Sequence, residues 1–156
     1  NGGQYTHAAM WAIIAFAKLG FGDKALEYYR MINPIEHTRT KEATIKYKQE
    51  PYVIPADIYG ANNLAGRGGW TWYTGSSSWF LNAGIENILG LKVENGILKI
   101  EPSIPEKWEE YSIKYRYKTS IYNIKIKNPD ARNSRSKGIL FKWKQNRRKT
   151  SKIRGR

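Results

Sequence analysis

The spacing of the apolar residues changes once along this chain, close to Gly90. In segments before that residue, such as 23–32 and 76–89, apolar side chains recur every three to four positions, which is the period of an amphipathic helix. After it they recur at every second position, which is the period of a half-buried strand. A single change of this kind predicts a mixed fold, in which a block of helices is followed by a block of antiparallel strands.

Two helices joined by a short turn are predicted near the start. Residues 8–19 are apolar around nearly the whole helical wheel, which is typical of a buried helix. Residues 23–32 are amphipathic, with Asp23 as the expected N-cap. The short connection between the two predicts a helical hairpin.

A third helix is predicted at residues 76–89, where Trp79, Phe80 and later apolar residues have helical spacing. Residues 35–67 separate it from the hairpin and show no regular period. A stretch of this length is long for an idle connection in a compact domain, and long ordered loops tend to carry function.

The second block predicts antiparallel strands. Asn95-Gly96 lies between two short apolar runs, which is a strong signal for a β-hairpin. Residues 113–118 and 122–127 alternate between apolar and polar side chains, as half-buried strands do.

The net charge of +14 is concentrated in the last residues. Residues 128–156 contain eleven Lys or Arg and one Asp. A block of like charge is usually solvated, so we expect this basic tail to be disordered, or non-native if a shifted reading frame produced it. The alternative interpretation is non-specific nucleic-acid binding through the tail.

Composition excludes several classes of protein. The chain contains no Cys, which removes disulfides and thiol catalysis. No apolar run approaches the roughly 20 residues of a membrane span. The chain begins at Asn1 without Met or a basic leader, so we expect it to be a piece of a longer protein.

The sequence GRGGWTWYTGSSSWF, at residues 66–80, is the first candidate for a site. Its glycines let the backbone approach a ligand or simply form a turn. Trp70, Trp72 and Tyr73 can stack on sugar rings or fill a core. Thr74-Gly75 stands before the third helix, where free N–H groups can hold an anion, although Thr is also an ordinary N-cap.

The two histidines differ in their surroundings. His7 opens the first helix, and its imidazole can donate to an oxyanion or have a structural role. His37 has no spaced partner of the kind that a metal site requires, so no metal is expected.

Three segments, taken in order, resemble the carboxy-terminal part of glycoside hydrolase family ninety-four. They are NGGQYTHAA with Trp11, then EPYV at 50–53, then GRGGWTWYTG at 66–75. The family includes cellobiose and chitobiose phosphorylases, β-1,2-oligoglucan phosphorylases and the phosphorylase-like end of cyclic β-1,2-glucan synthases. The resemblance covers about residues 1–127.

That resemblance implies a domain order. Residues 1–90 would be the closing helices of an (α/α)6 barrel, and residues 91–127 would be strands of a carboxy-terminal antiparallel β-sandwich. Residues 128–156 remain the basic tail.

The resemblance also implies an activity. In the family, inorganic phosphate attacks the anomeric carbon of a β-linked gluco-oligosaccharide with inversion and releases glucose 1-phosphate, without a cofactor. The residues at phosphate-binding positions are His7, Thr74 and Gly75, assisted by an Arg upstream of this chain. Contact with the sugar is expected from Arg67, Trp70, Trp72 and Tyr73.

The general acid of the family is an Asp that lies upstream of Asn1, so we expect no catalytic residue in this chain and no activity from it alone. Glu50, Asp57 and Glu86 are not assigned that role. The parent is expected to be a cytoplasmic homodimer without membrane or nucleic-acid partners, and the first motif favours the β-1,2-glucan members. A non-catalytic carbohydrate-binding module is the alternative.

Overall fold

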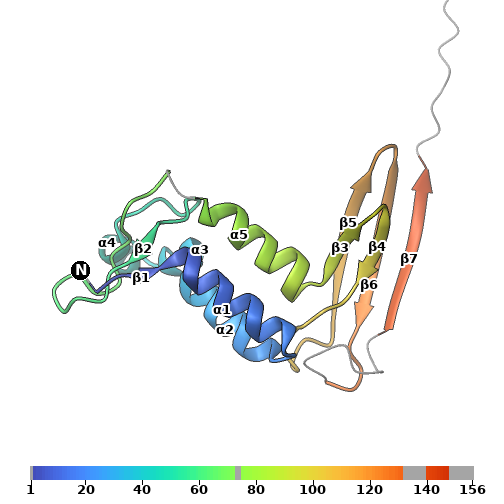
Figure 1. Cartoon of the computed structure of the whole chain (residues 1–156), viewed down its shortest axis with the longest axis horizontal. Coiled ribbons are helices and arrows are strands. Elements are labelled where there is room, and N and C mark those ends of the chain that lie inside the picture. Colours follow the sequence, from blue (N-terminus) through green and yellow to red (C-terminus); the bar gives the residue numbers. More distant parts are fainter. Residues whose placement is uncertain (1, 73–74, 132–139, 148–156) are drawn as a thin grey trace, which may run out of the picture. The chain divides into compact units, whose positions relative to one another are not determined.

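Helices occupy the first part of the chain and antiparallel strands the second, as the change in apolar spacing predicts (Figure 1). The computed structural model describes residues 2–72, 75–131 and 140–147. The chain forms two compact units, one that runs to Pro105 and one that begins at Glu106. The mixed fold class is therefore confirmed.

The predicted hairpin consists of α1 (Thr6–Lys18) and α2 (Gly22–Ile32), which lie side by side in Figure 1. Gly20 reverses the chain between them with a φ of +86°, a conformation that glycine adopts readily. The prediction of Asp23 as the N-cap is wrong, because α2 begins at Gly22 and its N-cap is Phe21. Asp23 instead lies in the first turn, where a carboxylate is favourable beside the positive end of the helix.

The third predicted helix is divided into two kinds of turn. Its first part is the α-helix α5 (Ser76–Asn82), and its second part is the π-helical segment η1 (Ala83–Ile88). The Leu89 N–H donates to the Gly84 carbonyl, five residues back, at 2.9 Å. Such wider turns are rare and break the 3.6-residue period on which the prediction rests.

One core holds the three helices together. Tyr29 of α2 stacks on Phe80 of α5, with ring centroids 4.1 Å apart. Burial raises the pKa of the Tyr29 hydroxyl to about 12, because the phenolate is poorly solvated there. The buried apolar residues of this core come from α1, α2 and η1: Met10, Ile13, Ala17, Ala25, Ile32, Ala83 and Ile88.

The stretch predicted to be irregular contains short regular elements. These are α3 (Pro34–His37), α4 (Lys41–Tyr47) and β2 (Asp57–Ile58), which pairs with β1 (Gln4–Tyr5). The α4 helix forms because Thr40 caps it: the Thr40 hydroxyl accepts from the Ala43 N–H at 3.2 Å. The prediction of an irregular stretch is therefore wrong for α4.

The β3 (Leu91–Glu94) and β4 (Ile97–Ile100) strands form the predicted hairpin around Asn95-Gly96. Both turn residues have positive φ, 51° for Asn95 and 78° for Gly96, as a tight hairpin turn requires. The hairpin belongs to the same compact unit as the helices. The Glu101 N–H bonds to the Gly90 carbonyl at 2.8 Å, which ties the end of β4 to the end of η1.

The second unit contains a three-stranded antiparallel sheet in the order β5, β6, β7. The strands are β5 (Glu110–Tyr117), β6 (Ser120–Lys127) and β7 (Leu140–Arg147). The β7 strand falls within the tail that was predicted to be disordered. Phe141 and Trp143 alternate there with lysines, which is the period of a strand. The predictions for residues 132–139 and 148–156 lie outside the described residues.

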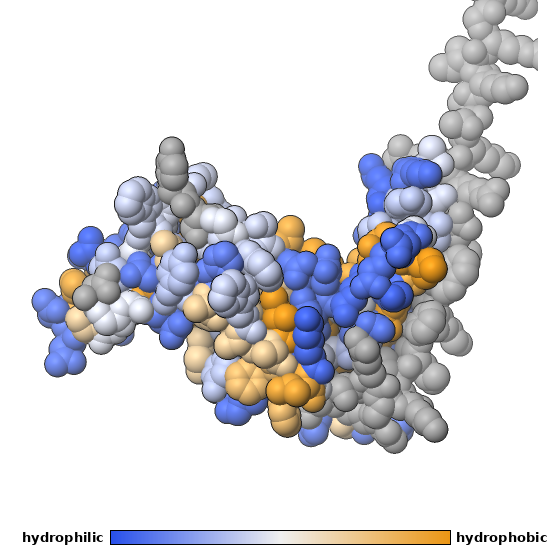
Figure 2. Space-filling view, viewed as in Figure 1, coloured by the Kyte–Doolittle hydropathy of each residue, from blue (hydrophilic) through white to orange (hydrophobic). Residues whose placement is uncertain are grey.

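Apolar side chains gather over the α1 and α2 hairpin (Figure 2). Trp11, Leu19, Phe21 and Met31 are each more than half exposed. The expected all-round burial of α1 is therefore not provided by the described residues. Although α1 is apolar, no helix in the described part of the chain is long and apolar enough to cross a membrane.

Alanine substitutions at Gly90 and Gly96 should separate a steric clash from backbone strain. Both residues have positive φ, so alanine is strained by about 1 to 2 kcal/mol at either site. A Cβ on Gly90 would also overlap the backbone of Glu101 and Pro102, whereas one on Gly96 meets nothing within 4 Å. In denaturant titrations of the full-length protein, we expect Gly90→Ala to lose at least about 2 kcal/mol more than Gly96→Ala. Equal losses would contradict this packing.

Candidate functional site

Backbone hydrogen bonds bring the first and third motifs together. The Thr6 N–H donates to the Ala56 carbonyl at 2.8 Å, and the Ala56 N–H donates to the Trp70 carbonyl at 2.6 Å. On either side of this ladder, β1 pairs with β2, and the Gly69 N–H bonds to the Asp57 carbonyl at 2.8 Å. Segments that are some 50 residues apart in sequence therefore lie side by side.

The glycines of the third motif allow close approach to other parts of this chain. A Cβ on Gly69 would overlap the Asp57 carboxylate. The Gln49 side-chain amide donates to the carbonyls of both Gly68 and Gly69, at 2.9 Å each. Of the two roles open from the sequence, these contacts favour a tightly held turn for this pair of glycines.

Two residues of the second motif contact Trp72 of the third motif, whose backbone is strained. The Trp72 indole N–H donates to Glu50 Oε1 at 3.2 Å, and the Tyr52 ring lies edge-on to it with centroids 6.2 Å apart. Trp72 has a φ of +68°, which is unusual for a bulky residue. Its side chain is 67% exposed, so burial does not account for the strain. Strain of this kind tends to occur at functional sites.

His7 lies in an aromatic cluster at the start of α1. Its ring centroid is 5.2 Å from that of Trp11 and 5.3 Å from that of Trp79. The Nε2 atom is shielded from solvent and has no hydrogen-bond partner among the described residues, and the same is true of Thr6 Oγ1. A buried polar atom without a partner costs about 1–3 kcal/mol, which a bound ligand can recover.

Gly75 precedes α5 on the same side of the helix as Trp79, because residues four apart in a helix share one face. Since Trp79 contacts His7, the N-terminal end of α5 lies near the imidazole. Gly75 is exposed, and a Cβ built on it meets nothing within 4 Å. His7 thus contacts the helix that Gly75 precedes, while Tyr73 and Thr74 lie outside the described residues.

The remaining candidates are spread around this region. Arg67 and Trp70 are exposed, and Trp70 is 71% accessible. Glu86 is exposed on η1. His37 stacks on Tyr47 with centroids 4.7 Å apart, and its Nε2 lies 2.6 Å from the Met31 carbonyl oxygen. These contacts give His37 a structural position.

Three residues that contact members of the site were given no place in it from the sequence alone: Trp11, Trp79 and Gln49. Trp11 follows His7 by four positions, and Trp79 follows Gly75 by four, so helical spacing could have shown that each pair shares a face. Gln49 carried no comparable signal, because its partners lie 19 and 20 residues away.

The helical region thus carries an aromatic, glycine-rich stretch directly before its last helix, and antiparallel strands follow it. The chain belongs to the Glycosyl hydrolase 94 superfamily, whose catalytic-domain model matches residues 1–90. The model for the Glycosyl hydrolase family 65 C-terminal domain matches residues 91–138. The family resemblance read from the three motifs is confirmed.

Several characterised proteins are similar to this chain. A cyclic beta-(1,2)-glucan synthase of Rhizobium meliloti is 46% identical over 126 residues, which are 81% of this chain and 4% of that protein. An N,N'-diacetylchitobiose phosphorylase of Vibrio furnissii is 34% identical over 89% of the chain and 17% of its own length. A solabiose phosphorylase of Paenibacillus borealis is 32% identical over 82% and 16%. The chain spans less than a fifth of these relatives.

Substitutions at Gln49 should loosen the third motif. Gln49→Ala removes both donors from partly buried carbonyls, and we expect a loss of about 1–3 kcal/mol in the free energy of unfolding. Gln49→Glu should lose more, because a carboxylate would face two carbonyl oxygens. Denaturant titrations of the full-length protein measure both, with the exposed Lys41→Ala as the control. An unchanged midpoint for Gln49→Glu would contradict the contact.

Proposed function

We propose that this chain is the carboxy-terminal part of an inverting glycoside phosphorylase. The parent protein uses inorganic phosphate to cleave β-linked gluco-oligosaccharides and releases glucose 1-phosphate. Support comes from membership of the family and from relatives named as phosphorylases of chitobiose and solabiose.

The observation that carries the proposal is the unpartnered Nε2 of His7. The imidazole packs against two tryptophan rings, which restricts its rotation, and its Nε2 atom lacks a partner among the described residues. The unprotonated oxygens of an oxyanion accept hydrogen bonds, and a donor that is already oriented binds them with little reorganisation. Phosphate is thus a ligand that satisfies this group.

Phosphate would be bound by three donors: the His7 Nε2–H, the Thr74 hydroxyl and the Gly75 amide. Neutral donors at a helix start can orient an anion without cancelling its charge, so the nucleophile keeps its reactivity. Phosphate arrives already anionic and replaces the base-activated water of an inverting hydrolase. The reaction then needs one general acid, which we assign to an Asp outside this chain. Because that acid is missing, we expect this chain alone to be inactive.

The sugar would be contacted by exposed side chains of the third motif. Trp70 and Trp72 are 71% and 67% exposed, and the apolar faces of sugar rings stack on aromatic side chains. Glu50 and Tyr52 hold Trp72 in position. Arg67 and Tyr73 complete this proposed contact set.

The linkage we favour is β-1,2, because the relative that is 46% identical is named as a cyclic beta-(1,2)-glucan synthase. Residues 1–90 would be the closing helices of an (α/α)6 barrel, and 91–127 strands of a β-sandwich. The exposed apolar residues over α1 and α2 support further barrel helices as partners. A cytoplasmic, homodimeric parent without a cofactor completes the proposal.

The full-length protein should form glucose 1-phosphate when it is incubated with phosphate and β-1,2-linked gluco-oligosaccharides. His7→Ala and Thr74→Ala should each lower kcat/KM for phosphate about 10²-fold or more, as the loss of an oxyanion donor does. His37→Gln, which changes the histidine that is stacked on Tyr47, is the matched control and should retain activity. Parallel reactions with β-1,3- and β-1,4-linked substrates test the linkage.

Other products would contradict the proposal in distinct ways. Free glucose without sugar phosphate would indicate a hydrolase. Oligosaccharide binding that is unaffected by phosphate, with no product, would indicate a carbohydrate-binding module. Full activity in His7→Ala would remove His7 from the phosphate site.

A further inference from the structure

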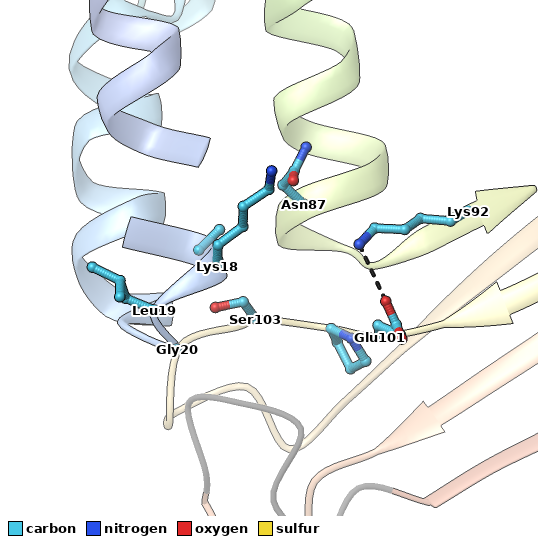
Figure 3. Close-up of a pocket in the computed structure, with 9 residues that line it drawn as sticks. Lys18, Leu19, Gly20, Asn87, Lys92, Glu101 and Ser103 are labelled. Carbon is cyan, nitrogen blue, oxygen red and sulfur yellow. Dashed lines mark hydrogen bonds and ion pairs between the residues drawn. The ribbon is translucent and has the colours of Figure 1, made fainter. Parts of the chain in front are cut away.

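A cavity of about 180 Å³ lies where the C-terminal end of α1 meets η1 and the β3 and β4 hairpin (Figure 3). It has room for a few water molecules and is smaller than the pockets of about 300–1,000 Å³ that hold drug-sized ligands. Lys18 lies eleven residues after His7, so the cavity is about 16 Å along α1 from the candidate phosphate site. Its size suits a small polar molecule or ion.

Ser103 supplies a buried hydroxyl to this cavity. The residue is 3% exposed, and its Oγ has no hydrogen-bond partner among the described residues. Its N–H donates to the Ile88 carbonyl at 2.9 Å, which fixes the backbone. Figure 3 shows the hydroxyl directed toward the end of α1, where Lys18 and Leu19 lie. A hydroxyl held in this way is costly to leave unpaired, so it favours a polar group in the cavity, either water or a ligand.

The charges around the cavity leave an excess of one positive charge. Lys92 Nζ pairs with Glu101 at 3.2 Å, and the two side chains are 18% and 30% exposed. Lys18 makes no ion pair with any residue that the structure describes. Figure 3 shows its ammonium group reaching toward Asn87, on the far side of the cavity from the ion pair. The uncompensated ammonium favours an anion.

Asn87 adds an oriented acceptor. Its side-chain N–H groups donate to the Asn82 backbone carbonyl at 3.3 Å and to the Asn82 side-chain oxygen at 3.1 Å. These bonds leave the Asn87 amide oxygen as an acceptor beside the cavity. The cavity thus offers the donors of Lys18 and Ser103 and the acceptor of Asn87, a set that fits an oxyanion that still carries a proton.

We propose that this cavity is a second oxyanion site, which binds inorganic phosphate through Lys18, Ser103 and Asn87. Lys18 and Asn87 belong to the part matched by the catalytic-domain model, and Ser103 to the part matched by the C-terminal-domain model. A bound anion therefore joins the helices to the segment after β4. This site is separate from His7 and does not depend on the proposed phosphorolysis.

The test is isothermal titration of the full-length protein with inorganic phosphate, in a His7→Ala background that removes the first proposed site. We expect one phosphate to bind, with an affinity about tenfold lower after Lys18→Gln, because a charged hydrogen bond is lost. Lys24→Gln is the matched control, since Lys24 is an exposed lysine paired with Glu27 on α2. It should leave the affinity unchanged.

Ser103→Ala separates binding from folding. In the same His7→Ala background it removes an unpaired buried hydroxyl, so the thermal midpoint without phosphate should be unchanged or higher, while the rise in midpoint on adding phosphate should be lost. No phosphate binding in the His7→Ala background, equal affinity in Lys18→Gln, or equal binding of neutral glycerol would each overturn the proposal.

Discussion

The two-step hydrogen-bond ladder from Thr6 to Ala56 to Trp70 is the contact on which the rest of the site depends. It joins the start of α1 to the middle of a long connection and then to the glycine-rich motif. Backbone groups buried in a loop must find partners, and here the partners are the other motifs themselves. The aromatic and polar side chains of the site are therefore presented from one backbone framework.

The periods of the apolar residues predicted the elements whose packing is amphipathic and regular. These periods did not predict elements that depend on a helix cap or on a different hydrogen-bond pattern. The α4 helix depends on a Thr40 cap, and η1 keeps the apolar face of a helix while its hydrogen bonds shift to a wider turn. The β7 strand was not predicted because it lies in a block of like charge. The lysines that suggested a solvated tail are also the polar residues of an alternating strand pattern.

The candidate site was predictable in part. The three motifs singled out His7 and Gly75, and Trp79 of the helix that follows Gly75 contacts the His7 ring. What the sequence could not supply was the partner of each polar group. The bond between Glu50 and Trp72 links residues 22 positions apart, and only the folded loop shows that the Glu50 carboxylate accepts a hydrogen bond from an indole.

The π-helical turn of η1 has an implication for how this chain tolerates changes in length. A π-turn uses one more residue than an α-turn, and each helical residue rotates the following chain by about 100°. Deleting one residue between Ala83 and Ile88 would restore ordinary helix but turn Gly90 away from its contact with Glu101. Exposed positions such as Ile85 and Glu86 can therefore vary in side chain, whereas their number is fixed by the hairpin that follows.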